Sequence, residues 1–119
     1  MMPVSIATAE HYLWGDSFDG WHLVNRADLS VIQERVPPGS VEVRHKHARA
    51  RQFIFVVSGV ATFEVGGVVH TLGTQQGIEV PPDTPHQFRN LSSDDVTFLV
   101  VSSPHSHDDR IVVNNIDGI

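Results

Sequence analysis

The chain has 119 residues, no cysteine and eight histidines, with 8 basic against 14 acidic side chains. This length allows one domain with a hydrophobic core, and 40% apolar with 18% charged residues is typical of globular proteins. The lack of cysteine excludes disulfides, thiolate metal sites and cysteine nucleophiles. The net charge of −6 argues against nucleic acid as the main partner, and no apolar run approaches the ~20 residues of a membrane helix. We therefore expect a cytoplasmic protein with neither a nucleic acid nor a membrane as its partner.

Helical periodicity is nearly absent. The only candidate is a short turn over residues 5–12, where Ser5 or Thr8 could act as the cap. Beyond it, short runs rich in Val, Ile, Phe and Thr are separated by Gly and Pro at intervals of about 8–12 residues, which predicts strands. The expected strands are 21–24, 29–36, 41–47, 52–57, 61–65, 68–72, 78–80, 86–91 and 96–102. The two glycines between Val65 and Val68 predict a tight hairpin turn, because both central residues of such a turn favour positive φ.

This pattern predicts an all-β fold, either a closed β-barrel or a two-sheet jelly roll. We expect one domain over residues 1–119, with a barrel core at about 20–103, an N-terminal arm at 1–19 and a C-terminal tail at 104–119. The tail is either a last strand, paired with its own sheet or with a second subunit, or it is mobile in its polar front half. Aromatic residues of the arm are expected to close one end of the barrel or to form a dimer contact rather than to stack on a substrate. They are Tyr12, Trp14, Phe18 and Trp21.

A His-x-His motif, His45 and His47, lies within the expected strand 41–47. In an extended strand, both histidines share one face with Val41 and Val43, while the charged residues between them point the other way. An apolar face is unusual for two imidazoles unless something satisfies their nitrogens, and a divalent metal ion would do so. For an isolated His-x-His motif, two surface histidines on an edge strand remain the alternative.

The spacing of further residues around this motif resembles the cupin family. The first cupin motif has glycine, His-x-His, glutamate and glycine in order, and this chain has Gly39, His45, His47, Gln52 and Gly59. The second motif has proline, glycine, histidine and asparagine, and this chain has Pro81, Asp83, His86 and Asn90, with Gly77 as the leading glycine. Glutamine thus replaces the glutamate of the first motif, and aspartate replaces a glycine of the second.

The resemblance implies a single cupin-type β-barrel, which is a jelly roll or double-stranded β-helix, with one divalent transition-metal ion and often a homodimeric assembly. It assigns His45, His47 and His86 as metal ligands. The metal could be Fe, Ni, Zn, Mn, Co or Cu, since imidazole-rich sites suit several of these ions. At the fourth position, Gln52 either ligates through its amide oxygen or only lines the barrel. Because Gln52 is neutral, we expect weaker metal binding and easier binding of an anionic ligand than in a glutamate site.

These features favour a metalloenzyme that acts on a small organic, conceivably anionic, substrate by Lewis-acid or dioxygenase-type chemistry. A non-catalytic small-molecule-binding or metal-binding cupin is the alternative, and a sugar isomerase or epimerase is a weaker one. No strong general base stands beside the ligands in sequence, although Glu34 or Glu79 could point inward. Arg49 or Arg51 could steer an anionic substrate at the barrel mouth.

Two further expectations concern the pocket and the tail. Phe88 and Phe98 are expected to shape an apolar pocket together with Val41, Val43 and Ile54. In the tail, the cluster of His105, His107, Asp108 and Asp109 could form a second metal site. A mobile or structurally hydrogen-bonded tail is the favoured interpretation of that cluster.

Overall fold

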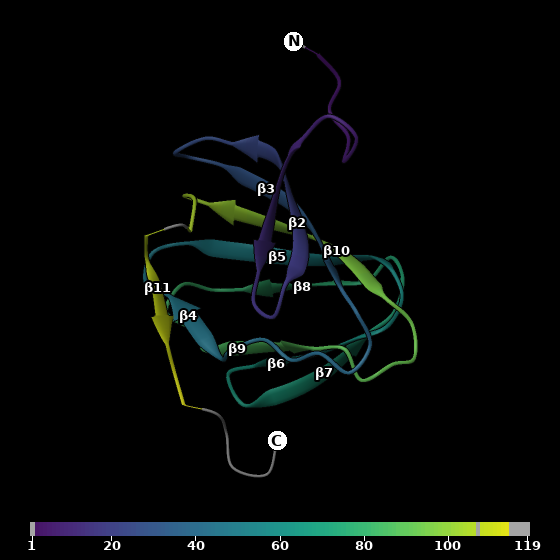
Figure 1. Ribbon diagram of the computed structural model, residues 1–119. Coiled ribbons are helices and arrows are strands. Elements are labelled where there is room, and N and C mark those ends of the chain that lie inside the picture. The colour runs from purple at the N-terminus through teal and green to yellow at the C-terminus, as the bar shows by residue number, and fades with distance from the viewer. Residues whose placement is uncertain (1, 107, 115–119) are drawn as a thin grey trace.

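The computed structural model describes residues 2–106 and 108–114 (Figure 1). Within these residues, every regular element is a β-strand, and the strands form two antiparallel sheets. The described part of the chain contains no helix long and apolar enough to span a membrane. The all-β prediction is confirmed.

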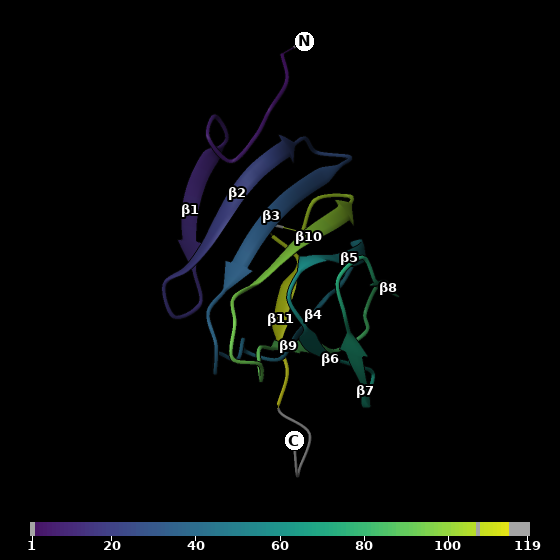
Figure 2. The ribbon, with the colours of Figure 1, turned by 90° about the vertical axis from the view of Figure 1, so that its right-hand side faces the viewer.

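The first sheet has six strands in the order β1-β2-β3-β10-β5-β8, and the second has five in the order β11-β4-β9-β6-β7. Figure 2 shows the second sheet facing one end of the first, where β10 and β5 lie. The first sheet comprises β1 Glu10–Trp14, β2 Phe18–Asn25, β3 Ser30–Val36, β5 Arg51–Ser58, β8 Gly77–Val80 and β10 Val96–Ser103. The second comprises β4 His45–His47, β6 Ala61–Val65, β7 Val68–Leu72, β9 His86–Arg89 and β11 Arg110–Val112.

The core lies between the sheets and follows the period-two pattern of the strands. In β10, Val96, Phe98, Val100 and Ser102 are buried, while the residues between them are not. Phe88 stacks on Phe98 across the two sheets, with ring centroids 4.4 Å apart. The hairpin predicted between β6 and β7 is confirmed, because Val65 pairs with Val68 and both central glycines have positive φ, 56° and 90°.

The segment before His45 differs from the expected strand. Only β4 is regular there, and Val41 and Val43 are 44% and 56% exposed, whereas Arg44 is 7% exposed. The regular alternation predicted for residues 41–47 is therefore wrong, and of the two valines expected on the inward face only Val43 lines the cavity of the histidines. The physical cause is a buried ion pair: Arg44 Nε lies 2.6 Å from Glu64 Oε1 on β6, which turns a charged side chain inward where simple alternation would point it outward.

Both ends of the chain contribute strands outside the range 20–103. The N-terminal segment makes a single turn, in which the backbone N–H groups of Thr8 and Ala9 donate to the Ser5 carbonyl, and then continues as β1. At the other end, β11 pairs antiparallel with β4, so the tail adds to one of its own sheets. The sequence left open whether a tail strand pairs with its own sheet or with a second subunit, and the structure shows pairing with its own sheet.

Candidate metal centre

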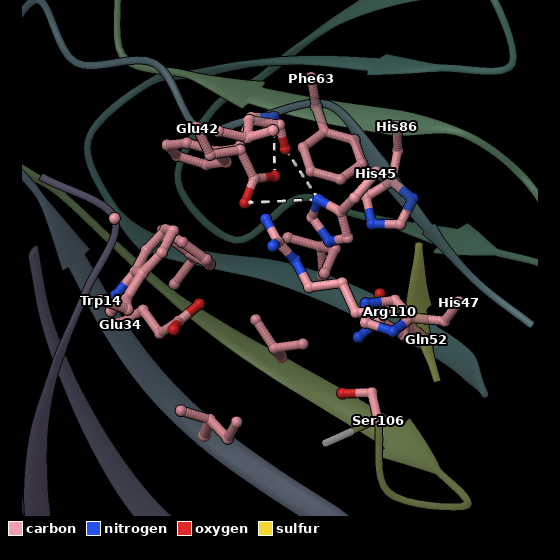
Figure 3. Close-up of a pocket in the computed structure, with 17 residues that line it drawn as sticks. Trp14, Glu34, Glu42, His45, His47, Gln52, Phe63, His86, Ser106 and Arg110 are labelled. Atoms are coloured by element: carbon pink, nitrogen blue, oxygen red, sulfur yellow. Dashed lines mark hydrogen bonds and ion pairs between the residues drawn. The ribbon is translucent and has the colours of Figure 1, made fainter. Parts of the chain in front are cut away.

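Three histidines come together on the inner side of the second sheet. His45 and His47 lie two residues apart on β4, and His86 pairs directly with His45 from the neighbouring strand β9. All three are buried, and each offers one ring nitrogen within 4.8 Å of the nitrogens offered by the other two. Figure 3 shows the three side chains at one wall of a cavity. This is the set of residues that the resemblance to the cupin motifs assigned as ligands.

The second nitrogen of each imidazole is already engaged. His45 Nδ1 lies 2.9 Å from the Val43 carbonyl oxygen, and His86 Nδ1 lies 2.9 Å from the Thr84 carbonyl oxygen. His47 Nδ1 lies 2.9 Å from Asp109 Oδ1. Carbonyl and carboxylate oxygens accept, so each Nδ1 carries the proton and donates. The Nε2 lone pair of each ring is therefore the one available to an ion.

The histidines are held in the neutral form that metal binding requires. Burial is the main cause, and it lowers the pKa of His45 to about 3 and that of His86 to about 4. Burial also lowers the pKa of His47, against the opposing effect of its hydrogen bond to Asp109. At neutral pH no proton has to leave the three Nε2 atoms before an ion binds.

The donor set fits a divalent transition-metal ion. Metal–imidazole bonds of about 2.0–2.1 Å place neighbouring nitrogens roughly 2.8–3.4 Å apart around an octahedral or tetrahedral ion. The three ligand nitrogens lie within 4.8 Å of one another, so they are grouped around a common point that one ion could occupy. Nitrogen donors without sulfur suit Zn, Ni, Cu, Co and Fe.

Gln52 lies in the same cavity, on β5 of the first sheet, and is 5% exposed. Its Nε2 donates to Ser102 Oγ at 3.0 Å, which orients the amide. The amide oxygen is then the atom left to approach an ion or a ligand on the histidine side. The fourth candidate ligand is thus adjacent to the triad, and it carries no charge.

The cavity beside the histidines has a volume of about 440 Å³. Its apolar wall includes Phe63, Phe88, Phe98 and Ile54, and Trp14 borders it from β1. The prediction that Phe88, Phe98 and Ile54 shape the pocket is confirmed, and Val43 also lines it. Val41, which was also expected there, does not line the cavity.

Two glutamates, Glu34 and Glu42, also line the cavity (Figure 3). Glu34 Oε2 accepts a hydrogen bond from the Tyr12 hydroxyl at 2.9 Å, and burial raises the pKa of Glu34 to about 7. Glu42 Oε1 accepts from the Phe88 N–H at 3.0 Å, and burial raises the pKa of Glu42 to about 8. Of the two carboxylates considered from sequence, Glu34 points inward, whereas Glu79 is exposed and pairs with Arg51.

The arginine at this cavity is Arg110 on β11, which the sequence analysis did not single out. Arg49 and Arg51, the expected steering residues, form exposed ion pairs with Asp108 and Glu79 and do not line the cavity. No short motif marks Arg110, because only the pairing of β11 with β4 brings it to the site.

A family model described as Cupin domain matches residues 32–102, more than half of the chain. The chain belongs to the cupin family. This cupin is 36% identical over 55 residues to Protein SchB of Streptomyces halstedii, a match that covers 46% of this chain and 40% of SchB. The chain thus spans less than half the length of that curated relative.

Solved cupin structures share the fold of this cupin. KdgF from Halomonas sp. superposes with a TM-score of 0.79 at 21% identity, over 87% of this chain and 94% of KdgF. A predicted oxalate decarboxylase from Thermotoga maritima gives a TM-score of 0.80 at 17% identity, over 87% of this chain and all (100%) of that one. Such similarity establishes the double-stranded β-helix architecture.

One departure of this cupin from the family motifs, the aspartate in the second motif, has a local explanation. Asp83, at a glycine position of the second motif, has φ of 62°, a left-handed conformation that Asp tolerates better than most residues. Its N–H donates to the His47 carbonyl at 2.7 Å, so the turn is tied to β4.

In the tail, Asp109 is a hydrogen-bond partner of His47. The second metal site, which was the less favoured interpretation of the tail cluster, includes His107, and that residue lies outside the described residues.

Proposed function

We propose that this cupin is a metal-dependent enzyme in which His45, His47 and His86 hold one divalent transition-metal ion beside a pocket for a small organic substrate. The main support is the orientation of the three imidazoles, each with its Nδ1 engaged and its Nε2 available to a common ion. When bound, such an ion supplies a Lewis acid that polarises a substrate oxygen.

The charge of the site favours an anionic substrate. Three neutral imidazoles and the neutral amide of Gln52 leave the full charge of a divalent ion uncompensated by its ligands. In a cavity walled by aromatic side chains, this charge attracts an anionic oxygen more strongly than it would in water. We propose Gln52 as the fourth ligand or as a residue that orients a ligand beside the ion.

Glu34 is the proposed proton-transfer group. Tyr12 occupies its Oε2, which leaves Oε1 for a substrate, and burial holds the pKa of Glu34 at about 7. A carboxyl group with such a pKa is populated in both protonation states near neutral pH, as a general acid–base requires. In the proposed step, Glu34 Oε1 takes a proton from a substrate carbon next to a polarised carbonyl, the C–H electron pair shifts toward that carbonyl, and Glu34 later returns the proton.

The first experiment measures metal content. Protein purified without a histidine tag is incubated with Zn²⁺, Fe²⁺, Ni²⁺ or Co²⁺ and desalted. Its metal content is then measured by inductively coupled plasma mass spectrometry. We expect one ion per chain in the wild type and none in the triple variant His45→Ala/His47→Ala/His86→Ala. His70→Ala, on β7 outside the cavity, is the matched control and should keep its ion. A wild type that binds no ion, or a triple variant that keeps one, would overturn the metal site.

The second experiment tests the chemistry. Loaded protein is incubated in D₂O with a panel of hydroxy acids, oxo acids and sugar phosphates, and ¹H NMR follows loss of carbon-bound hydrogen. We expect exchange in at least one panel member that disappears in Glu34→Gln. Metal-loaded protein that binds panel members without any exchange or conversion would instead support the non-catalytic binding function.

A further inference from the structure

We propose that Arg110 is the anchor for a substrate carboxylate, so that the pocket takes a small carboxylic acid whose second oxygen function reaches the metal. This inference rests on the proposed function, because the second oxygen is placed by an ion at the histidine triad. It adds the class of substrate and a residue outside the matched family domain, which ends at residue 102.

The strand register places Arg110 next to the triad. Arg110 on β11 pairs directly with His47 on β4 in an antiparallel ladder. Directly paired residues project from the same face of a sheet, with Cβ atoms about 4.5–5.5 Å apart. Both side chains therefore enter the cavity from neighbouring points of the second sheet, and both line it (Figure 3).

Arg110 and the triad border the same cavity. Arg110, His45, His47 and His86 all line it, and Figure 3 shows Arg110 beside His47. A ligand that reaches an ion at the three Nε2 atoms would thus occupy a cavity that the Arg110 side chain also lines.

The guanidinium group has no partner of its own among residues 2–106 and 108–114. Three other described arginines differ, because Arg44 pairs with Glu64, Arg49 with Asp108 and Arg51 with Glu79. Arg110 forms neither an ion pair nor a side-chain hydrogen bond with another described residue, although Glu34 and Glu42 line the same cavity. Its hydrogen-bond donors are thus available to a ligand.

A carboxylate fits this arrangement better than a phosphate. The planar guanidinium group matches the two oxygens of a carboxylate in a bidentate pair. A phosphate dianion carries more charge and more acceptor oxygens, and Arg110 is the sole arginine or lysine among the described lining residues. The aromatic wall, with Phe63, Phe88 and Phe98, suits a short carbon skeleton between the two oxygen ends.

The test is calorimetric titration of zinc-loaded protein with lactate, pyruvate and malonate, with the neutral analogue lactamide and with inorganic phosphate. Variants are Arg110→Gln, which removes the charge, and Arg110→Lys, which keeps the charge but loses the planar fork. Arg26→Gln, in the β2–β3 turn away from the cavity, removes the same charge elsewhere. Metal content is measured first for every protein.

We expect the wild type and Arg26→Gln to bind at least one of the three carboxylates, and Arg110→Gln to bind it about 10- to 100-fold more weakly. Arg110→Lys should fall between them, and lactamide should bind weakly to all variants. Equal carboxylate affinity in metal-loaded wild type and Arg110→Gln overturns this inference and leaves the proposed metal site standing. Phosphate binding that exceeds carboxylate binding and depends on Arg110 also overturns it. A wild type that binds none of the four ions Zn²⁺, Fe²⁺, Ni²⁺ and Co²⁺ overturns both proposals, and if it binds one of the others but not zinc, the titration is run with that ion.

Discussion

Asp109 Oδ1 accepts the Nδ1–H of His47 at 2.9 Å, although 62 positions separate the two residues in sequence. The other carboxylate oxygen, Oδ2, accepts the backbone N–H groups of Arg49 and Ala50, both at 2.9 Å. Burial works to raise the pKa of Asp109, but these hydrogen bonds outweigh it and hold the pKa below its usual value. A single ionised carboxylate from the tail therefore fixes both the ring of His47 and the loop that follows β4.

Replacing Asp109 by Asn should weaken metal binding by about 10- to 100-fold, the usual cost of losing a hydrogen-bond partner of a metal-ligating histidine. Asn presents one oxygen and one NH₂ group, so a donor must face either His47 or the two backbone N–H groups. Competition titration with a chromophoric chelator measures the affinity. Asp108→Asn, at an exposed ion pair with Arg49, is the matched control and should leave affinity unchanged. Unchanged affinity in Asp109→Asn would show that this hydrogen bond does not tune the site.

Gln52→Glu should tighten metal binding, because a carboxylate adds a charge–charge attraction inside a low-dielectric cavity. Ser102 can still donate its hydroxyl to the new side chain, so the local packing is retained. The same competition titration should show at least about a tenfold gain at pH 7, a change of about 1.4 kcal/mol. Gln33→Glu on β3, which does not line the cavity, adds the same net charge and should have little effect. Equal or weaker affinity in Gln52→Glu would argue against Gln52 at the ion.

The protonation of Glu34 should make stability depend on pH. Its folded-state pKa of about 7 lies above the ordinary value of 4.5, so the folded protein holds a proton that the unfolded chain releases between these values. Stability from this group is present below about pH 4.5 and is lost as pH rises to about 7. Glu34→Gln keeps a neutral side chain that can accept from Tyr12. Relative to the wild type, it should therefore gain stability in urea unfolding between pH 5 and pH 8.

The control for Glu34 is Glu79→Gln, which removes an exposed carboxylate paired with Arg51. Its stability relative to the wild type should not rise over the same pH interval. If Glu34→Gln and the wild type lose stability in parallel from pH 5 to pH 8, the carboxyl of Glu34 is ionised throughout. Its proposed part in proton transfer would then fail.

The buried pair of Arg44 and Glu64 should be a major contributor to stability. The two groups form a bidentate contact, and Arg44 Nη1 also donates to the Asn114 carbonyl at 2.9 Å. Glu64→Gln leaves a buried guanidinium group without its counter-ion and should lower the free energy of unfolding by about 3–5 kcal/mol. Asp108→Asn breaks an exposed pair and should cost about 1 kcal/mol or less. A loss below 1 kcal/mol in Glu64→Gln, measured by urea unfolding, would contradict this assignment.

Local patterns were sufficient to predict much of the fold. Alternating apolar runs and turn residues depend on neighbours in sequence, which is why the β6–β7 hairpin and a strand over residues 96–102 were predicted. The segment before His45 was not, because the burial of Arg44 depends on Glu64, 20 residues away. β1 was missed since its Glu-His-Tyr-Leu-Trp sequence has no regular alternation and its strand pairing depends on β2.

The residues of the candidate site also fall into a group that was identified from sequence and a group that was not. The three histidines and Gln52 were assigned through the resemblance to the cupin motifs, whereas Glu42 and Arg110 were not identified. Asp109 was considered as part of a second metal site or of a hydrogen-bonded tail, and its contact with His47 was not predicted. Glu42 was expected to point outward from a regular strand. Asp109 and Arg110 enter the site through β11, whose partner strand is some 60 residues earlier in the chain. Pairings over such distances leave no periodic signal in a single sequence.

The matched family domain, residues 32–102, carries the three histidines, whereas Trp14 and Arg110 reach the cavity from segments on either side of it. The same flanking segments also hold residues of the candidate site in place, because Asp109 accepts a hydrogen bond from His47 and Tyr12 donates one to Glu34. Exchanging the flanking segments between cupins would therefore change the pocket wall and the support of the proposed metal ligands together.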